Sequence, residues 1–427
     1  MSWQTYYKEH CVSMEELVTK LPHEDVLCMF PSTTGEPKAI FRAMTASSKA
    51  FRNVTIASMM QMAENPFCSP EMQGHFNFLS FFNGPEAREP VRKKQADFTP
   101  IYYHQMPKLI KRLKPEVAIL HLSPPDENGW CSFGVLTDYQ RTLVETAQIV
   151  VAQVNRKMPR TLGKCFVHVT EIDWLTEISE EIPTIAPSKS GPVEMEIGKN
   201  CASLIRNADC LQLGIGSIPD AVLKQLTEKR DLGLHSEMLS DGIRDLMESG
   251  IMTNRYKKLD PFQSTATFAM GTSRLYQYIH NNPAVNMAPV DYTNDPYIIS
   301  QQENMVTINS ALQVDLMGQV AADTIGPLQY SGVGGQVDFV RGANMACNGR
   351  NIIALPSTAR KGTVSRISLE LPQGGAVTTN RHDVDYVITE YGIAQLWGKT
   401  LSQRAEALIA VAHPDFREKL KAEYQRI

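Results

Sequence analysis

Residues 210–241 read C-L-Q-L-G-I-G-S-I-P-D-A-V-L-K-Q-L-T-E-K-R-D-L-G-L-H-S-E-M-L-S-D, and this stretch decides the fold. Apolar side chains alternate over its first residues, which predicts a strand. The G-I-G turn at 214–216 lets the backbone bend sharply. Pro219 then suits the first turn of a helix, for which Ser217 is the expected N-cap. A second strand is expected over 232–239, so the stretch predicts a strand–turn–helix–strand unit.

Glu237, near the carboxyl end of the second predicted strand, is expected beside the glycine turn, because ligands of open α/β sheets bind beyond the carboxyl ends of strands. Three interpretations stay open on these residues alone. One is a dinucleotide site, since an acid follows Gly216 by about 20 residues, although Pro219 stands where the third glycine of G-x-G-x-x-G belongs. A second makes Glu237 a nucleophile and the turn an oxyanion hole. In the third, the turn only joins a strand to a helix, and Glu237 is a solvated strand-end residue.

Composition limits the protein class and its partners. The chain has 427 residues, of which 43% are hydrophobic, as expected for a globular protein of two or three domains. A net charge of −4 without a Lys/Arg block argues against a nucleic-acid partner. We expect no membrane partner, because no apolar run approaches about 20 residues and the N-terminus lacks the apolar core of a signal peptide. The eight cysteines form no C-x-x-C pair, which indicates a reduced, cytoplasmic setting and buried thiols.

Strand and helix patterns alternate along the chain, which predicts an α/β fold with mostly parallel sheets. The clearest strands are expected at 26–30, 54–60, 76–82, 116–122, 148–155 and 386–389, and the clearest helices at 14–21, 106–113, 193–207 and 401–411. A proline-rich segment at 177–197 reads as a linker, so two domains are expected, 1–187 and 188–427. The stretch 281–296 is expected to be a long irregular loop, and such loops are often functional.

A second glycine cluster, G-V-G-G-Q-V-D-F at 332–339, follows in the second half. Together with the turn G-I-G-S-I at 214–218, it could direct two backbone N–H groups at an oxyanion that forms beside Glu237. Each turn alone is weak evidence, and the combination predicts one site.

Three longer segments carry a family resemblance. They are V-I-T-E-Y-G-I-A-Q-L-W-G-K-T-L-S-Q-R-A-E-A-L-I-A-V-A-H-P-D-F-R at 387–417, S-P-P-D-E-N-G-W-C-S-F-G at 123–134 and N-R-K-M-P-R-T at 155–161. In this order and spacing they resemble the acetyl-CoA hydrolase/transferase family, a class I CoA-transferase family, over essentially the whole chain. The resemblance is strongest to its 4-hydroxybutyrate CoA-transferase and butyryl-CoA:acetate CoA-transferase branch.

The resemblance implies two CoA-transferase-type (Rossmann-like) α/β domains, of which the second carries the site. It makes Glu237 the nucleophile that forms a glutamyl-CoA thioester in a ping-pong transfer of CoA, from an acyl-CoA such as acetyl-CoA or butyryl-CoA to a short-chain carboxylate such as 4-hydroxybutyrate. It implies CoA or acyl-CoA as a substrate, no metal, and a homodimer or larger homo-oligomer. The residues that it places against CoA are Gly214, Ile215, Gly216, Ser217, Ile218, Leu312, Gly335 and Lys361.

Further expectations concern the groups around this chemistry. The first domain is expected to select the acid through the 31–37 turn and the 123–134 loop, and Ser32 stands where relatives often have His. Glu237 is expected to be ionised at neutral pH, as a glutamate with a pKa of about 4.3 would be. His235 is expected to pack or to make a structural hydrogen bond rather than to tune Glu237. Two alternatives stay open: an acyl-CoA hydrolase, in which water intercepts the intermediate, and a catalytically idle regulatory or sugar-phosphate-binding protein.

Overall fold

The computed structural model describes residues 1–62 and 65–426, which form two compact units. Unit 1 comprises Met1–Ile185 and Ala266–Tyr292, and unit 2 comprises Ala186–Thr265 and Thr293–Ile427. The chain therefore returns to unit 1 for one segment after it has entered unit 2. The predicted domain limits, 1–187 and 188–427, stay a prediction.

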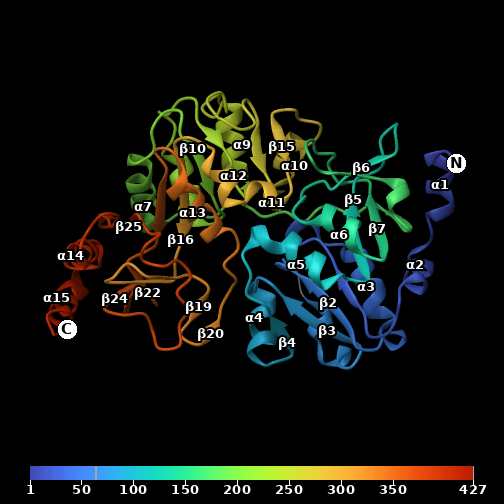
Figure 1. Cartoon of the computed structure of the whole chain (residues 1–427), viewed down its shortest axis with the longest axis horizontal. Coiled ribbons are helices and arrows are strands. Elements are labelled where there is room, and N and C mark those ends of the chain that lie inside the picture. Colours follow the sequence, from blue (N-terminus) through green and yellow to red (C-terminus); the bar gives the residue numbers. More distant parts are fainter. Residues whose placement is uncertain (63–64, 427) are drawn as a thin grey trace. The chain divides into compact units, whose positions relative to one another are not determined.

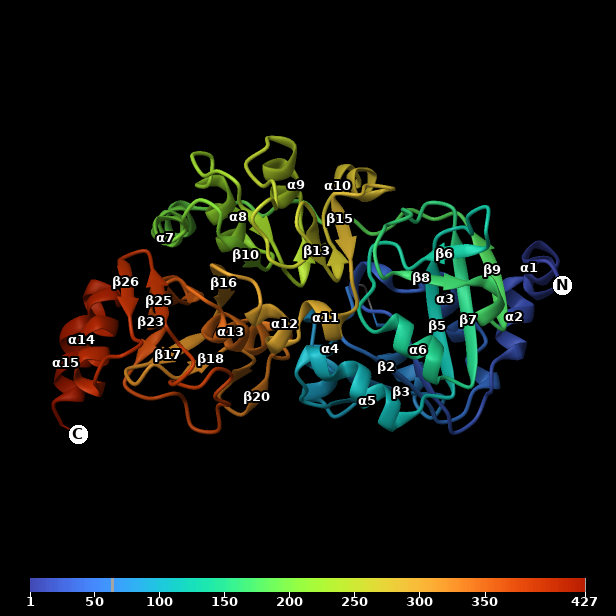
Figure 2. The ribbon, with the colours of Figure 1, turned by 45° about the horizontal axis from the view of Figure 1, so that its top comes forward.

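Unit 1 is built on a seven-stranded sheet in which all neighbouring strands are parallel (Figures 1 and 2). In spatial order its strands are β4 (Ala96–Phe98), β3 (Phe76–Ser80), β2 (Val54–Ser58), β1 (Leu27–Met29), β5 (Val117–Leu122), β7 (Ile149–Asn155) and β9 (Trp174–Ile178). The helices of its first segment are α1 (Trp3–His10), α2 (Met14–Lys20), α3 (Lys38–Ala46), α4 (Pro85–Arg92), α5 (Met106–Leu113) and α6 (Gln140–Thr146). All six residues of β5 are buried, as expected for a central parallel strand that is covered on both faces.

Smaller elements complete unit 1. The strands β6 (Trp130–Ser132) and β8 (Phe166–His168) form an antiparallel pair. Short 3₁₀ turns are present at Thr33–Gly35, Ser48–Ala50, Pro66–Cys68, Pro70–Met72, Tyr103–Gln105 and Val169–Glu171. The returning segment holds β14 (Phe268–Ala269), α10 (Ser273–Ile279), β15 (Val285–Met287) and α11 (Val290–Thr293), which ends at the first residue of the next segment of unit 2.

Unit 2 is built on a six-stranded sheet, parallel except for its last strand. In spatial order its strands are β11 (Gly233–Leu234), β10 (Cys210–Leu213), β16 (Met305–Ser310), β21 (Arg350–Ala354), β25 (Tyr386–Thr389) and β26 (Gly392–Gln395). Its helices are α7 (Pro192–Ser203), α8 (Ser217–Lys224), α9 (Asp241–Glu248), α12 (Pro296–Ser300), α13 (Gln336–Met345), α14 (Leu401–Val411) and α15 (Pro414–Tyr424). Its short strands are β12 (Met238–Leu239), β13 (Ser264–Ala266), β17 (Gln313–Asp315), β18 (Val320–Ala321), β19 (Thr324–Ile325), β20 (Leu328–Gln329), β22 (Thr358–Ala359), β23 (Val364–Ser365) and β24 (Ile367–Ser368).

The α/β fold with mostly parallel sheets is confirmed, and the helices expected at 106–113 and 401–411 have those bounds. Several local expectations are wrong. The strand expected over 232–239 is two short strands, β11 and β12, and residues 235–237 between them belong to neither. The N-cap of α8 is Gly216 rather than Ser217, which is already the first helical residue.

Three further segments differ from the expectation. The segment 177–197 begins inside β9 and ends inside α7, so only its middle is irregular. The stretch 281–296 contains β15 and α11. Helix α13 follows directly from the second glycine cluster, where a turn was expected, because Gly335 supplies the N-cap position and the residues after it bury an apolar face.

Five of the cysteines are buried, and burial raises the pKa of Cys28, Cys131 and Cys201 to about 12, which confirms the expectation of buried thiols for these residues. Among the described residues, no helix has the length and apolar character needed to cross a membrane. The cytoplasmic setting stays a prediction.

Candidate active site

The parallel pairing of β10 and β11 brings the first glycine turn level with Glu237. Leu211 pairs with Leu234, and the N–H of His235 continues the ladder by donating to the carbonyl of Leu211 at 3.1 Å. One residue before Glu237, Ser236 Oγ donates to the carbonyl of Leu213 at 3.2 Å. The G-I-G turn and Glu237 therefore follow neighbouring strands at the carboxyl edge of the sheet, where α/β proteins bind ligands.

Two donors hold the half-buried Glu237 carboxylate. Asn294 Nδ2 donates to Glu237 Oε2 at 2.8 Å, and the backbone N–H of Gly335 donates a second hydrogen bond. A Cβ atom at residue 335 would overlap Glu237 Oε2 and Asn294 Nδ2, so only glycine leaves room for this arrangement. Glu237, Asn294 and Gly335 thus form a compact group within unit 2, to which we refer as the glutamate cluster.

Burial raises the pKa of Glu237 from its ordinary value of 4.5 to about 7. The hydrogen bond from Asn294 lowers this pKa, the nearby carboxylate of Asp338 raises it, and the N–H of Gly335 lowers it. This pKa corrects the expectation that Glu237 is ionised at neutral pH as a free glutamate would be. Burial outweighs both donors, so Glu237 holds its proton more tightly than a glutamate in water.

The G-I-G-S-I turn presents its backbone to open space. No atom lies within 4 Å of a Cβ position built at Gly214 or Gly216, and Gly216 has a φ of +118°, a conformation suited to glycine. Ile215 is 47% exposed, whereas the Ile218 side chain is buried. Ser217 begins α8, whose first N–H groups have no partner within the helix and favour an anion. The turn can therefore offer backbone donors to a ligand, and Ile218 can do so only through its backbone.

The other two residues implied in CoA binding follow two further strands of the same sheet. Leu312 comes two residues after β16 and donates its N–H to the carbonyl of Ala321 at 2.9 Å. Lys361 is exposed at the tip of the β22–β23 hairpin, which follows β21. Both Arg360 and Lys361 have positive φ values, +49° and +58°, which is a strained conformation for side chains of this size.

Two polar residues of this region were missed from the sequence. Asn294 lies in the stretch T-N-D-P, and its contact with Glu237 spans 57 residues, so no local pattern points to it. Asp338 lies buried in the first turn of α13, where its charge acts on Glu237. The only signal for Asn294 was its place in an irregular stretch, and such stretches are often functional.

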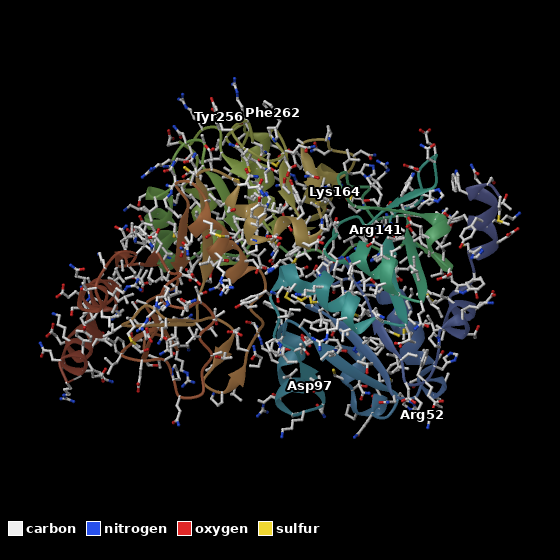
Figure 3. All side chains as sticks on the ribbon, viewed as in Figure 1. Arg52, Asp97, Arg141, Lys164, Tyr256 and Phe262 are labelled. Carbon is white, nitrogen blue, oxygen red and sulfur yellow. The ribbon has the colours of Figure 1, made fainter. Side chains whose placement is uncertain are left out.

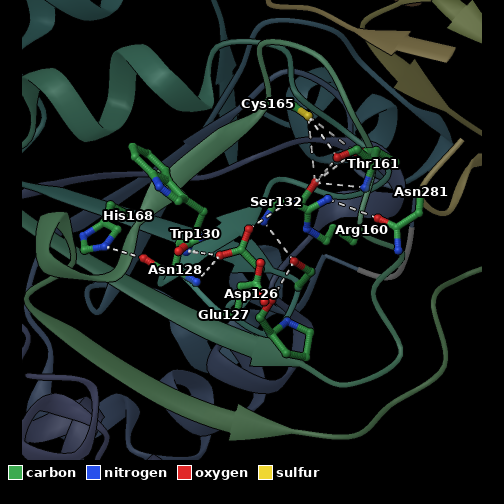
Figure 4. Close-up of polar contacts among 12 residues, drawn as sticks. Asp126, Glu127, Asn128, Trp130, Ser132, Arg160, Thr161, Cys165, His168 and Asn281 are labelled. Carbon is green, nitrogen blue, oxygen red and sulfur yellow. Dashed lines mark hydrogen bonds and ion pairs between the residues drawn. The ribbon is translucent and has the colours of Figure 1, made fainter. Parts of the chain in front are cut away.

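In unit 1, two of the segments that carry the family resemblance contact each other (Figure 4). Asp126 Oδ1 accepts the N–H groups of Asn128 and Trp130, both at 3.0 Å, which closes a turn, and Asp126 Oδ2 accepts Arg160 Nη2 at 2.9 Å. The hydroxyls of Ser132 and Thr161 lie 3.0 Å apart. Asp126 therefore forms a turn, and the 123–134 and 155–161 segments form one structural support.

The 31–37 turn of unit 1 contains a second set of buried polar groups. Ser32 Oγ donates to Asp138 Oδ2 at 3.5 Å, and Glu36 accepts the N–H of Met62 at 2.7 Å. Burial raises the pKa of both Glu36 and Asp138 to about 7. Within the described part of the chain, the side-chain amide of Asn83 is buried and has no hydrogen-bond partner.

Unit 1 also carries an open surface pocket of about 750 Å³, which is lined by Arg141, Lys164 and the exposed Trp130. Figure 3 labels Arg141 and Lys164. Arg141 is held by Glu145 and Glu171. None of the residues implied in CoA binding lines this pocket. In the described residues no group of three or more His, Cys, Asp or Glu could hold a metal ion, and a metal-free reaction stays a prediction.

Comparisons with known proteins agree on one family. The N-terminal domain of the acetyl-CoA hydrolase/transferase family matches residues 1–187, and its C-terminal domain matches residues 271–424. The chain is 47% identical over 428 residues to a 4-hydroxybutyrate coenzyme A transferase of Clostridium kluyveri, covering 100% of both chains. It is 35% identical to a butyryl-CoA:acetate CoA-transferase of Anaerostipes caccae, covering 98% of this chain and 97% of that one. The crystal structure of a 4-hydroxybutyrate CoA-transferase from Porphyromonas gingivalis has a TM-score of 0.87 and 38% identity, with 100% of both chains covered.

Proposed function

Because the chain belongs to the acetyl-CoA hydrolase/transferase family, we propose that it transfers CoA from an acyl-CoA to a short-chain carboxylate such as 4-hydroxybutyrate. It is an enzyme of the CoA-transferase type. The observation that supports the chemistry most directly is the glutamate cluster, in which a half-buried carboxylate at a sheet edge is held by two hydrogen-bond donors.

In the first step of the proposed mechanism, the ionised Glu237 carboxylate attacks the thioester carbonyl carbon of the acyl-CoA. The oxyanion that forms on the acyl group accepts hydrogen bonds from backbone N–H groups of the Gly214–Gly216 turn, and the exposed backbone of that turn supports this assignment. The C–S bond then breaks, CoA leaves as a thiolate, and Glu237 becomes part of a mixed acyl-glutamyl anhydride.

In the second step, the CoA thiolate attacks the glutamyl carbonyl carbon of the anhydride. Negative charge now develops on the carbonyl oxygen of Glu237 itself, and Asn294 Nδ2 and the N–H of Gly335 already point at this carboxyl group. Preorganised donors of this kind are worth about 3–4 kcal/mol of transition-state stabilisation each. The first carboxylate leaves, and a glutamyl-CoA thioester remains on Glu237.

An acceptor carboxylate then runs the two steps in reverse and departs as the new acyl-CoA, which gives ping-pong kinetics. One thioester replaces another, so the reaction needs no ATP. Lys361 and Leu312 are proposed to contact CoA, because both follow carboxyl ends of strands in the sheet that carries Glu237 and Lys361 offers an exposed cation to its phosphates.

The raised pKa of Glu237 suits this cycle. A carboxylate that is poorly solvated is a stronger nucleophile than one in water, and a pKa of about 7 leaves an adequate ionised fraction at neutral pH. Acid selection is proposed for unit 1, through the 31–37 turn with Ser32 and the 123–134 loop. A cytoplasmic location and assembly into a homodimer or larger homo-oligomer are proposed with the transferase function.

The test measures product formation from butyryl-CoA or acetyl-CoA with and without 4-hydroxybutyrate. We expect 4-hydroxybutyryl-CoA to form with ping-pong kinetics and free CoA to appear far more slowly. Release of CoA at the same rate with and without the acid would establish the hydrolase alternative. A protein that binds acyl-CoA and makes neither product would be the idle binding protein.

A further inference from the structure

The glutamate cluster depends on the placement of Asn294, and a buried side chain two residues before Glu237 contacts the residue that precedes Asn294. We propose that His235 is a positioning residue, which fixes the Thr293–Asn294 segment so that the Asn294 amide meets the Glu237 carboxylate. This proposal rests on the proposed transferase function and assigns a role that the family resemblance does not give to His235.

The hydrogen bonds of His235 lead from the Glu237 segment to the Asn294 segment. His235 is fully buried, and its Nε2 lies 2.9 Å from the carbonyl oxygen of Thr293. Its Nδ1 lies 3.3 Å from Gln302 Nε2. The same histidine ring therefore contacts the residue that precedes Asn294, while its own backbone lies two residues before Glu237.

The partners of Gln302 determine the histidine tautomer. Gln302 Oε1 accepts the backbone N–H groups of Lys258 and Leu259 at 3.1 and 3.2 Å, so its Nε2 faces the other way and acts as the donor. Nε2 donates to the carbonyl of Leu259 at 3.1 Å and to His235 Nδ1. Because Nδ1 accepts, the ring proton is on Nε2 and is donated to Thr293. Burial lowers the pKa of His235 to about 3, so this neutral form persists across the working pH range.

The last link orients the Asn294 amide. Thr293 Oγ1 donates to Asn294 Oδ1 at 2.9 Å, which leaves Nδ2 to donate to Glu237 Oε2. Thr293 and Asn294 are both fully buried. Removing the His235 hydrogen bond takes a donor away from the Thr293 carbonyl, so the Thr293–Asn294 segment is held less firmly and the Asn294 amide loses its fixed distance to Glu237.

The test is a double-mutant cycle between His235→Phe and Asn294→Ala, because residues that act through one contact are not additive. The assay is transfer of CoA from butyryl-CoA to 4-hydroxybutyrate. We expect N294A to lower kcat about 100-fold, H235F to lower it about 10- to 50-fold with KM for acyl-CoA within about twofold, and the double variant to be no slower than N294A. Thr293→Val, which removes only the hydroxyl, should also lower kcat and add nothing to N294A.

A second readout separates positioning from general damage to the fold. In H235F and T293V, the acid limb of the kcat/KM profile should move to higher pH. The Asn294 hydrogen bond lowers the pKa of Glu237, whereas the carboxylate of Asp338 raises it, so weakening that hydrogen bond should raise the pKa. His75→Phe is the matched control: its Nδ1 lies 2.8 Å from the carbonyl of Phe51 in unit 1, and its loss should leave that limb in place.

Multiplicative losses in the H235F/N294A variant, or an unmoved acid limb in H235F, would overturn the role of His235. Should H235F not fold, H235N decides in the same cycle, because Asn keeps a polar side chain that is too short to reach the Thr293 carbonyl. An inactive wild-type enzyme would refute the proposed function instead, so the two failures are distinguishable.

Discussion

Glu237 in unit 2 and Glu36 in unit 1 occupy similar places in two parallel sheets. Each follows a strand at the carboxyl edge, β11 for Glu237 and β1 for Glu36, and burial raises the pKa of both to about 7. Their surroundings differ. Glu237 is half-buried between a side-chain amide and a glycine N–H, whereas Glu36 is 3% exposed and accepts the N–H of Met62.

The comparison shows that a raised pKa does not by itself identify a nucleophile. A carboxyl that is not the proposed nucleophile acquires the same pKa through burial. What distinguishes Glu237 is access for a ligand together with donors aimed at the oxygen that receives negative charge. The predictions below test that difference, beginning with the largest expected effect.

Replacing each glutamate with glutamine should give the largest difference in kcat between the two sites. Glu237→Gln should lower kcat by more than about 10⁴-fold, since the amide is a poor nucleophile, and steady-state transfer measures this. Glu36→Gln should keep kcat within about tenfold. Equal losses in the two variants would show that Glu237 has no special role.

The glycines around Glu237 give the next contrast. Gly335→Ala places a Cβ against Glu237 and Asn294, and kcat should fall about 100- to 1000-fold. Gly214→Ala meets no protein atom within 4 Å, so the protein should fold normally, and the added methyl group beside the turn should raise KM for acyl-CoA as well as lower kcat. If Gly214→Ala leaves KM unchanged, the first glycine turn does not contact the thioester.

The pH dependence of kcat/KM should follow the ionisation of Glu237 and not that of Glu36. Because the attacking form is the carboxylate and its pKa is about 7, kcat/KM for acyl-CoA should fall as pH decreases, approaching tenfold per unit well below pH 7. E36Q should leave this limb in place. A profile that is flat down to pH 5 would contradict the desolvated state of Glu237.

Lys361→Ala should raise KM for acyl-CoA about 5- to 20-fold with little change in kcat, because it removes one charge from the CoA phosphates. Arg360→Ala, which has the neighbouring place in the same strained hairpin tip, is the matched control and should change KM by less than about threefold. Equal effects would assign phosphate binding to the hairpin rather than to Lys361.

The smallest expected effect is on the free energy of unfolding, and replacing either glutamate should change it in the same direction. Both carboxyls bind a proton more tightly in the folded than in the unfolded chain, so stability falls as pH rises from about 4.5 to about 7. Above pH 7, E237Q and E36Q should each be more stable by about 1–3 kcal/mol, and below pH 4.5 by close to nothing. Chemical denaturation at pH 4 and pH 8 measures this, and a gain at pH 4 as large as that at pH 8 would contradict burial as the cause.

Sequence patterns predicted the α/β fold and the neighbourhood of Glu237, because strand periodicity and glycine turns are local signals. They missed Asn294, since its partner is 57 residues away and only the fold brings the two together. They also joined β11 and β12 into one strand, although residues 235–237 belong to neither strand. The pKa of Glu237 was misjudged for the same reason: burial depends on tertiary packing that no local pattern contains.

The central claim is that Glu237 carries CoA covalently, and trapping tests it most directly. The protein is incubated with butyryl-CoA, reduced with borohydride and digested with trypsin, and the peptide from Asp231 to Arg244 is weighed. We predict a mass loss that matches conversion of the Glu237 carboxyl to an alcohol, dependent on acyl-CoA and absent from E237Q. An unmodified peptide, from a protein that has been shown to bind butyryl-CoA, would contradict the glutamyl-CoA thioester and remove Glu237 from the role of nucleophile.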